Sequence, residues 1–257
     1  MLAFDSAGPA GNQRTVLLHG WPLDRTIWSE VAGPLVVAEQ CVLYPDLPGF
    51  GDSPSLAEGH WTVEAYADEL ATLLRHLGSE PVALAGHSFG GYVALALAER
   101  HPDLVAGLGL VSSRTIADSE AGRRGRLETI EKVRARGSRV LLPDLARKLL
   151  APAASQPLLD RATRILERAR PEGVIAGLTA MAARPDRTEV LESYPGPVLI
   201  LHGREDQLIP EREAARPKPS SAVVREILPA AGHMPMWEDP DATARAIVRW
   251  ARMAHEG

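Results

Sequence analysis

The chain has 257 residues, of which 45% are hydrophobic and 24% charged, the composition of an ordinary globular domain. Its formal net charge of −5 excludes a broadly basic surface, so neither nucleic acid nor an anionic membrane is expected as a partner. The only cysteine, Cys41, excludes an internal disulfide and any multi-cysteine metal site.

The N-terminal residues 1–6 lack the basic segment and apolar stretch of a signal peptide. No uninterrupted apolar run reaches the length that a membrane crossing requires. We therefore expect a soluble, cytoplasmic protein. Whether it is a monomer or a dimer stays open.

Short apolar runs bounded by Gly, Pro or Asp predict six strands. Most of the runs are continuously hydrophobic, which is typical of parallel strands covered on both faces. Helical spacing predicts helices over 62–77, 90–100 and 241–253, the first with Thr62 as N-cap and Gly78 as stop. This alternation predicts a doubly wound, mostly parallel sheet. The predicted strands are 15–18, 41–44, 82–85, 104–111, 198–201 and 223–228.

The alternation breaks between residues 114 and 191, where helical spacing and repeated prolines predict three or four amphipathic helices. We therefore expect an α/β core made of residues 1–113 and 192–257, with residues 114–191 inserted as a helical cap, or lid. The insertion contains no aromatic residue, so we expect it to present an aliphatic surface to a substrate. The cluster of Arg123, Arg124 and Arg126 is interpreted as a solvated helix face.

The strongest chemical signal is the Gly-x-Ser-x-Gly pattern formed by Gly86, Ser88 and Gly90. A predicted strand leads into it and a predicted helix leads out, so the chain must turn sharply at the serine. Such a turn leaves no room for side chains two residues before and after, and both positions hold glycine. The context predicts that Ser88 is a nucleophile whose oxygen stands above the carboxyl edge of the sheet.

A serine nucleophile needs a base, and the base needs an acid that orients it. His233 lies between the last predicted strand and the final helix, where it can reach the turn at Ser88. Asp206 follows the predicted strand 198–201 and is our candidate acid. Glu205 is its main rival and Asp239 a lesser one, and spacing alone does not separate Glu205 from Asp206. In enzymes with this type of nucleophile turn, the serine, the acid and the histidine follow one another in this order along the chain.

Two backbone N–H groups are expected to stabilise an oxyanion. One belongs to Phe89, which follows the serine, and the other to Trp21, in the loop after the first predicted parallel strand. The indole ring of Trp21 would then also form a wall of the pocket. Pro22 has no N–H and cannot be the donor.

Three further histidines, His19, His87 and His202, are expected near the same sheet edge. Their spacing matches no metal-ligand motif, so we interpret them as structural residues and expect neither a metal nor a cofactor.

The segments 19–21, 46–53, 86–91, 203–206 and 232–233 together resemble the α/β-hydrolase superfamily, in particular its bacterial esterase, lactonase and cofactor-free haloperoxidase branch. The resemblance extends from about residue 15 to the C-terminus and implies an α/β-hydrolase fold with a helical lid. It also implies that the 46–53 loop is structural. The chain departs from the family in a leading hairpin reduced to about residues 1–5, so that the sheet is expected to be one strand short. A second departure is the Pro- and Arg-rich stretch 212–221.

These features predict a serine hydrolase that cleaves a small carboxylic ester through an acyl-enzyme, with Ser88, His233 and Asp206 as its catalytic residues. A lactonase, a carbon–carbon bond hydrolase or a perhydrolase would use the same residues. The run Trp21-Pro22-Leu23 resembles the oxyanion loop of perhydrolases. A hydrolase-derived sensor that binds a small molecule with little turnover is the alternative from another class.

Overall fold

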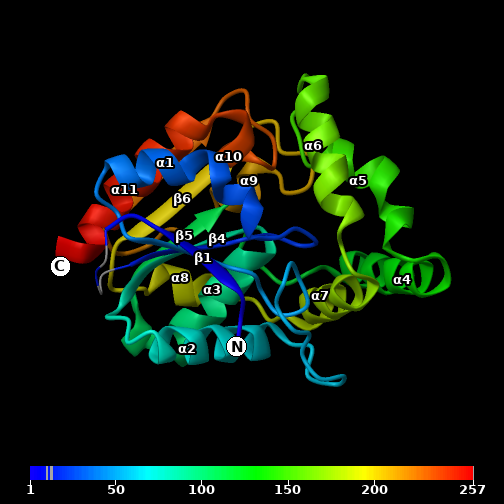
Figure 1. Cartoon of the computed structure of the whole chain (residues 1–257), viewed down its shortest axis with the longest axis horizontal. Helices are drawn as coiled ribbons and strands as arrows, with labels where there is room; N and C mark the ends of the chain where they lie inside the picture. Colours follow the sequence, from blue (N-terminus) through cyan, green and yellow to red (C-terminus); the bar gives the residue numbers. More distant parts are fainter. Residues whose placement is uncertain (10, 12–13, 257) are drawn as a thin grey trace.

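A computed structural model describes residues 1–9, 11 and 14–256 of the chain. In this part of the chain seven strands form one sheet (Figure 1). Their order is β1-β3-β2-β4-β5-β6-β7. Strand β1 runs antiparallel to β3, and all other neighbours are parallel. The strands are β1 (Phe4–Ala7), β2 (Thr15–Leu18), β3 (Val42–Pro45), β4 (Val82–His87), β5 (Val105–Val111), β6 (Val198–Gly203) and β7 (Val223–Leu228).

All six predicted strands are confirmed as β2–β7. Strands β2–β6 are buried along almost their whole length, which explains why their sequences show continuous apolar runs instead of alternation. The reduced leading hairpin contributes a single edge strand, β1, whose register runs from Phe4 opposite Pro45 to Ala7 opposite Val42.

Helices cover both faces of the sheet (Figure 1). On one face α1 (Ser29–Val37) packs against α11 (Pro240–Glu256), and on the other α3 (Phe89–Arg100) packs against α2 (Val63–His76) and α8 (Thr188–Glu192). The hydroxyl of Thr62 accepts a hydrogen bond from the N–H of Ala65 at 3.1 Å, and Gly78, with φ +58°, follows the end of α2. Both predicted ends of this helix are thus confirmed.

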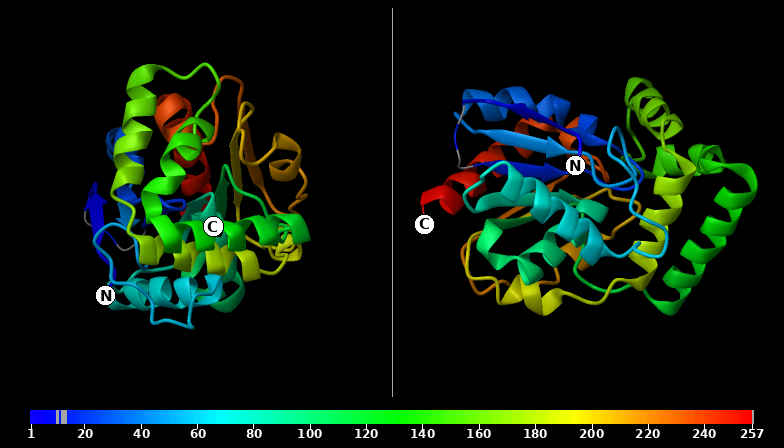
Figure 2. Two further views of the ribbon diagram at one scale, coloured as in Figure 1. Left: turned by 90° about the vertical axis from the view of Figure 1, so that its right-hand side faces the viewer. Right: turned by 60° about the horizontal axis from the view of Figure 1, so that its bottom comes forward.

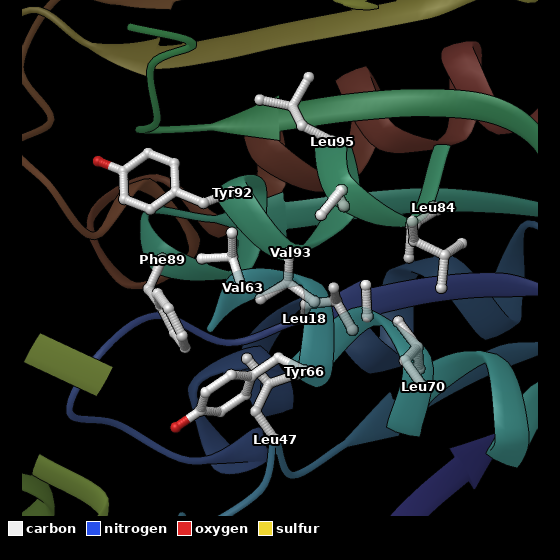
Figure 3. Packing of buried hydrophobic residues seen from close by; sticks show 14 of the residues in the cluster. Leu18, Leu47, Val63, Tyr66, Leu70, Leu84, Phe89, Tyr92, Val93 and Leu95 are labelled. Carbon is white, nitrogen blue, oxygen red and sulfur yellow. The ribbon is translucent and has the colours of Figure 1, made fainter. Parts of the chain in front are cut away.

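A cluster of buried hydrophobic side chains fills the space between the sheet and helices α2 and α3 (Figure 3). Within it the rings of Tyr66 and Phe89 pack edge to face, with centroids 5.0 Å apart. Phe89 is fully buried and directly follows Ser88. The core therefore fixes the backbone at the start of α3.

Between β5 and β6 the chain forms α4 (Glu120–Arg136), α5 (Leu142–Lys148), α6 (Gln156–Glu167) and α7 (Pro171–Ala183), which we call the inserted helices. Helix α4 packs against α7 and α5 against α6. The four helices lie together at one end of the molecule (Figures 1 and 2). Helix α8, which the sequence also placed in the insertion, contacts α3 instead.

Short elements complete the fold: the helices α9 (Glu211–Ala214) and α10 (Pro235–Glu238) and the 3₁₀ turns η1 (Arg25–Trp28), η2 (Pro102–Leu104) and η3 (Ser138–Leu141). The Pro- and Arg-rich stretch after Asp206 thus forms only one turn of helix, α9. None of the helices in the described residues combines the length and the hydropathy needed to cross a membrane.

Candidate active site

Ser88 occupies a sharp turn between β4 and α3. Its backbone has φ 50° and ψ −113°, a conformation that costs a non-glycine residue on the order of 1–3 kcal/mol. Two hydrogen bonds hold the turn in place: the Ser88 N–H donates to the carbonyl of Val111 at 2.9 Å, and the Ser113 hydroxyl donates to the carbonyl of Ser88 at 2.8 Å. The surrounding strands therefore impose the strained conformation that the sequence pattern predicts.

The glycines on either side of Ser88 are required by close backbone contacts. A Cβ atom on Gly86 would lie 2.1 Å from the carbonyl oxygen of Gly90, and one on Gly90 would lie 2.6 Å from the carbonyl oxygen of His19. Neither neighbouring atom can move without displacing main chain.

Gly86→Ala is therefore expected to lower the free energy of unfolding by about 3 kcal/mol or more, because the new methyl group overpacks backbone. Gly125→Ala, inside α4, is the matched control: nothing lies within 4 Å of its added Cβ, so it should raise the free energy of unfolding by about 0.5–1 kcal/mol. Denaturant unfolding of both variants checks this. Equal stability of Gly86→Ala and the wild type would contradict the close packing at the turn.

His233 and Asp206 meet in a buried contact. The loop after β7 carries His233, which is 2% exposed, and its Nδ1 lies 2.7 Å from Oδ2 of Asp206. The other carboxylate oxygen, Oδ1, accepts hydrogen bonds from the N–H groups of Leu208 and Ile209 at 2.8 and 2.9 Å. Both oxygens of Asp206 thus have defined partners.

The two rival carboxylates lie elsewhere. The side chain of Glu205 is exposed. The side chain of Asp239 accepts a hydrogen bond from the N–H of Ala242 and so caps α11. Of the three candidate acids, the structure brings Asp206 to His233.

Electrostatics favour an ionised Asp206. Burial alone raises the pKa of its carboxyl group, but the His233 side chain and the backbone hydrogen bond from Ile209 outweigh that effect and lower the pKa below its ordinary value. An ionised carboxylate accepts a hydrogen bond from the Nδ1–H of His233. In that tautomer Nε2 carries the free lone pair and can take a proton.

Ser88 and His233 line one pocket of about 140 Å³. Its walls come from the sheet edge, from the loop after Asp206 and from the inserted helices. The other lining residues are Trp21, Tyr92, Arg114, Arg126, Leu145, Met181, Leu208 and Ile209.

Of the two residues expected to bind an oxyanion, Phe89 directly follows Ser88 and Trp21 lines the same pocket as Ser88. Phe89 is the first residue of α3, so its N–H has no acceptor within the helix. Trp21 follows β2 and lines the pocket, and its Nε1–H donates to the carbonyl of Val174 in α7 at 3.0 Å. The indole therefore joins the core loop to the inserted helices.

The three other histidines expected at this sheet edge each pair with the backbone. His19 Nδ1 contacts the carbonyl of Gly20 at 2.9 Å, while its Nε2 accepts the N–H of Leu47 at 2.8 Å. Nε2 of His87 and of His202 contact the carbonyls of His233 and Ile209. Burial lowers the pKa of each. These contacts are those of neutral structural histidines, and no group in the described residues has the arrangement of a metal site.

The 46–53 loop is held by Asp46. Its buried carboxylate pairs with the guanidinium of Arg25 and accepts the N–H of Asp52 at 2.9 Å. Phe50, in this loop, packs edge to face on Phe89. Through Phe50 the loop thus contacts Phe89, the residue that follows Ser88.

The expectation of a purely aliphatic insertion is wrong. Arg126 of α4 lines the pocket together with Leu145 and Met181. The helical spacing of Arg126 with the buried Ile130 and Val133 could have revealed this, because the three residues share one face of α4. The sequence predicted that all three arginines of the basic cluster are exposed. Arg123 and Arg124 are exposed, but Arg126 is half-buried.

One carboxylate, Asp118, joins three arginines. It pairs with Arg114 at 2.7 Å, with Arg184 at 2.9 Å and with Arg126. Burial raises the pKa of Asp118, but the hydrogen bonds and charges of Arg126 and Arg184 outweigh it and lower the pKa to about 2. This cluster ties α4 and the end of α7 to the strand end after β5.

Asp118→Asn is expected to reduce the free energy of unfolding at pH 7 by on the order of 2 kcal/mol. Because the folded-state pKa is depressed, the ionised carboxylate stabilises fully above its unfolded pKa of about 4, and this contribution disappears as the pH falls towards 2. The difference in unfolding free energy between wild type and variant should therefore shrink from pH 5 to pH 3. A difference that does not change over this range would contradict the assignment.

Glu238 links the His233 loop to the inserted segment. Its carboxylate accepts the N–H of Ala151, just after α5, at 2.7 Å and the N–H of Gly232 at 2.8 Å. A Cβ on Gly232 would lie 2.3 Å from the nitrogen of Ala151, so the two backbones are in close contact. The position of His233 thus depends on the segment after α5.

Comparison with known proteins agrees with this fold. A family model described as the α/β-hydrolase fold matches residues 16–240. A thermophilic esterase from Thermogutta terrifontis, solved with malate bound, is 37% identical, with a TM-score of 0.89 over 99% of this chain and 94% of that one.

Two curated relatives also match over most of the chain. A pimeloyl-[acyl-carrier protein] methyl ester esterase from Methylococcus capsulatus is 31% identical over 90% of this chain and 92% of its own length. The dihydrolipoyllysine-residue acetyltransferase component of an acetoin cleaving system from Pseudomonas putida is 30% identical over 98% of this chain, which spans 67% of that protein. The chain therefore belongs to the α/β-hydrolase family.

Proposed function

We propose that this α/β hydrolase is a carboxylesterase that cleaves small carboxylic esters through an acyl-enzyme. The observation that carries the proposal is the shared pocket of Ser88 and His233, with Nδ1 of His233 held 2.7 Å from Asp206. The relatives named as esterases support the same reaction class.

In the proposed reaction Ser88 attacks the ester carbonyl while Nε2 of His233 takes the hydroxyl proton. The N–H groups of Trp21 and Phe89 bind the oxygen that becomes negatively charged. His233 then protonates the leaving alcohol, and a water molecule activated by the same imidazole releases the acid. Asp206 holds the Nδ1–H tautomer throughout and stabilises the imidazolium. No step calls for a cofactor.

We further propose that residues 114–191 act as a cap on a core formed by residues 1–113 and 192–257. Arg126, Leu145 and Met181 of the inserted helices line the pocket opposite the residues of the core, which supports this division. The cap would exclude water and select the substrate, a small ester molecule.

Release of nitrophenol from p-nitrophenyl butyrate tests the proposal. An esterase gives continuous turnover, because the acyl-enzyme is hydrolysed, and a burst of about one equivalent precedes it where deacylation is slower than acylation. Stoichiometric release without turnover would overturn the proposal in favour of a ligand sensor. No release with any ester of a graded chain-length series would overturn it as well.

A further inference from the structure

The pocket that holds Ser88 carries two guanidinium groups. Arg114 lies just beyond β5 and follows Ser113, whose hydroxyl supports the carbonyl of Ser88. Arg126 approaches from α4. Among the described residues that line this pocket none is an aspartate or a glutamate, so its wall carries charge of only one sign.

The neighbouring carboxylates do not neutralise this charge completely. Asp118 is shared by Arg114, Arg126 and Arg184, and Glu213 pairs with Arg114 at 2.6 Å. Three guanidinium groups thus share two carboxylates, which leaves one positive charge in excess. The side chain of Arg184 is 2% exposed, and its guanidinium lies 4.0 Å from the ring centroid of Tyr92. Arg184 does not line the pocket, so Arg114 and Arg126 are the groups that present the excess positive charge to a ligand there.

Both pocket arginines keep free hydrogen-bond donors. The Nε of Arg114 is buried and has no partner within the described residues. Arg126 uses Nε and Nη2 on Asp118, and its Nη1 has no partner in the described part of the chain. An acceptor for the buried Nε of Arg114 would remove a cost of about 1–3 kcal/mol, whereas Nη1 of Arg126 is not fully buried and offers an ordinary charge-assisted hydrogen bond.

The carboxylates also fix the direction of the guanidinium groups. Asp118 accepts hydrogen bonds from Nε and Nη2 on one edge of Arg126. Glu213 and Asp118 accept from the two terminal nitrogens of Arg114. An anion that enters the pocket therefore meets donors that need little reorganisation, which is the condition for strong charge-assisted hydrogen bonds.

We propose that Arg126, together with Arg114, binds a free carboxylate on the substrate, so that the preferred substrates are acid-bearing esters such as monoesters of dicarboxylic acids. The inference rests on the proposed esterase function and specifies its substrate class. Arg126 is then a specificity-determining residue and has no part in bond cleavage.

Matched pairs of substrates test the proposal. Monomethyl adipate and methyl hexanoate differ by a carboxylate on the acyl side, and 4-acetoxybutanoate and butyl acetate differ by one on the alcohol side. The measured quantity is kcat/KM for the acid-bearing ester divided by that for its neutral partner. We expect the wild type to favour the acid-bearing ester in at least one pair, which also identifies the side that faces the arginines.

Arg126→Gln is expected to lower this ratio about 10- to 100-fold in the favoured pair, because a charge-assisted hydrogen bond is lost. Arg126→Lys, which keeps the charge, should recover part of it. Arg124→Gln, an exposed neighbour on α4, is the control and should leave the ratio at the wild-type value. A ratio that Arg126→Gln does not change, or a wild type that favours the neutral ester in both pairs, would overturn the inference.

The two proposals fail differently. If the wild type cleaves neutral esters and the Arg126 variants show no change in the ratio, only the carboxylate-binding role is overturned. If it cleaves none of the four esters but turns over p-nitrophenyl butyrate, the carboxylate-binding role alone is overturned. If it cleaves neither these four nor any nitrophenyl ester of the chain-length series, both proposals are overturned.

Discussion

Ser88→Ala is expected to lower kcat for ester hydrolysis by about 10⁴–10⁶-fold and to leave the fold intact. The change removes only the hydroxyl group. Alanine and serine both carry a Cβ atom, so the strained backbone at φ 50° and the hydrogen bonds to the Ser88 N–H and carbonyl are retained. Steady-state release of nitrophenol measures the activity, and thermal unfolding measures the fold.

Ser112→Ala is the matched control for this variant. Ser112 also has a positive φ, 43°, and is fully buried after β5, but it does not line the pocket. It should keep the wild-type activity. If Ser88→Ala retained kcat within tenfold of the wild type, Ser88 would not be the nucleophile.

Asp206→Asn is expected to lower kcat by about 10³–10⁴-fold with little change in KM. The N–H groups of Leu208 and Ile209 both donate to Oδ1, so the amide oxygen of asparagine must occupy that position. Its NH₂ group then faces Nδ1 of His233 and donates to it. This selects the tautomer with a proton on Nε2, which cannot accept the proton of Ser88.

Glu205→Gln serves as the control, because the Glu205 side chain is exposed and adjacent in sequence. Its kcat should equal that of the wild type. A loss of activity in Glu205→Gln together with a normal Asp206→Asn variant would exchange the roles assigned to the two acids.

The strands and the turn at Ser88 could be predicted because they depend on local sequence. A parallel strand covered on both faces must be apolar at successive positions, so β2–β6 are visible as continuous runs. The turn requires glycine at Gly86 and Gly90 for steric reasons, and the distances of an added Cβ to backbone atoms bear this out.

The choice between Glu205 and Asp206 could not be made from sequence, because it depends on which of the two adjacent side chains the local turn places in the interior. The N–H of Asp206 donates to the carbonyl of Gly203 at 3.2 Å, and this turn places Asp206 in the interior while Glu205 is exposed. The helical spacing of Arg126 with Ile130 and Val133 indicates its inward face, but how its charge is compensated could not be predicted from sequence. Its charge is compensated by Asp118, which precedes α4 and is recognisable as a partner only in three dimensions.

The contact between Glu238 and Ala151 bears on how substrate preference can change in this family. The donor at Ala151 is a main-chain N–H, so any residue except proline at position 151 preserves it. Side chains on the inserted helices can therefore be replaced, or the helices exchanged with those of a relative, while the imidazole of His233 keeps its place as long as the backbone near Ala151 follows the same path. Under the proposed function, new specificities can thus arise in the inserted helices while the proposed catalytic residues keep their places.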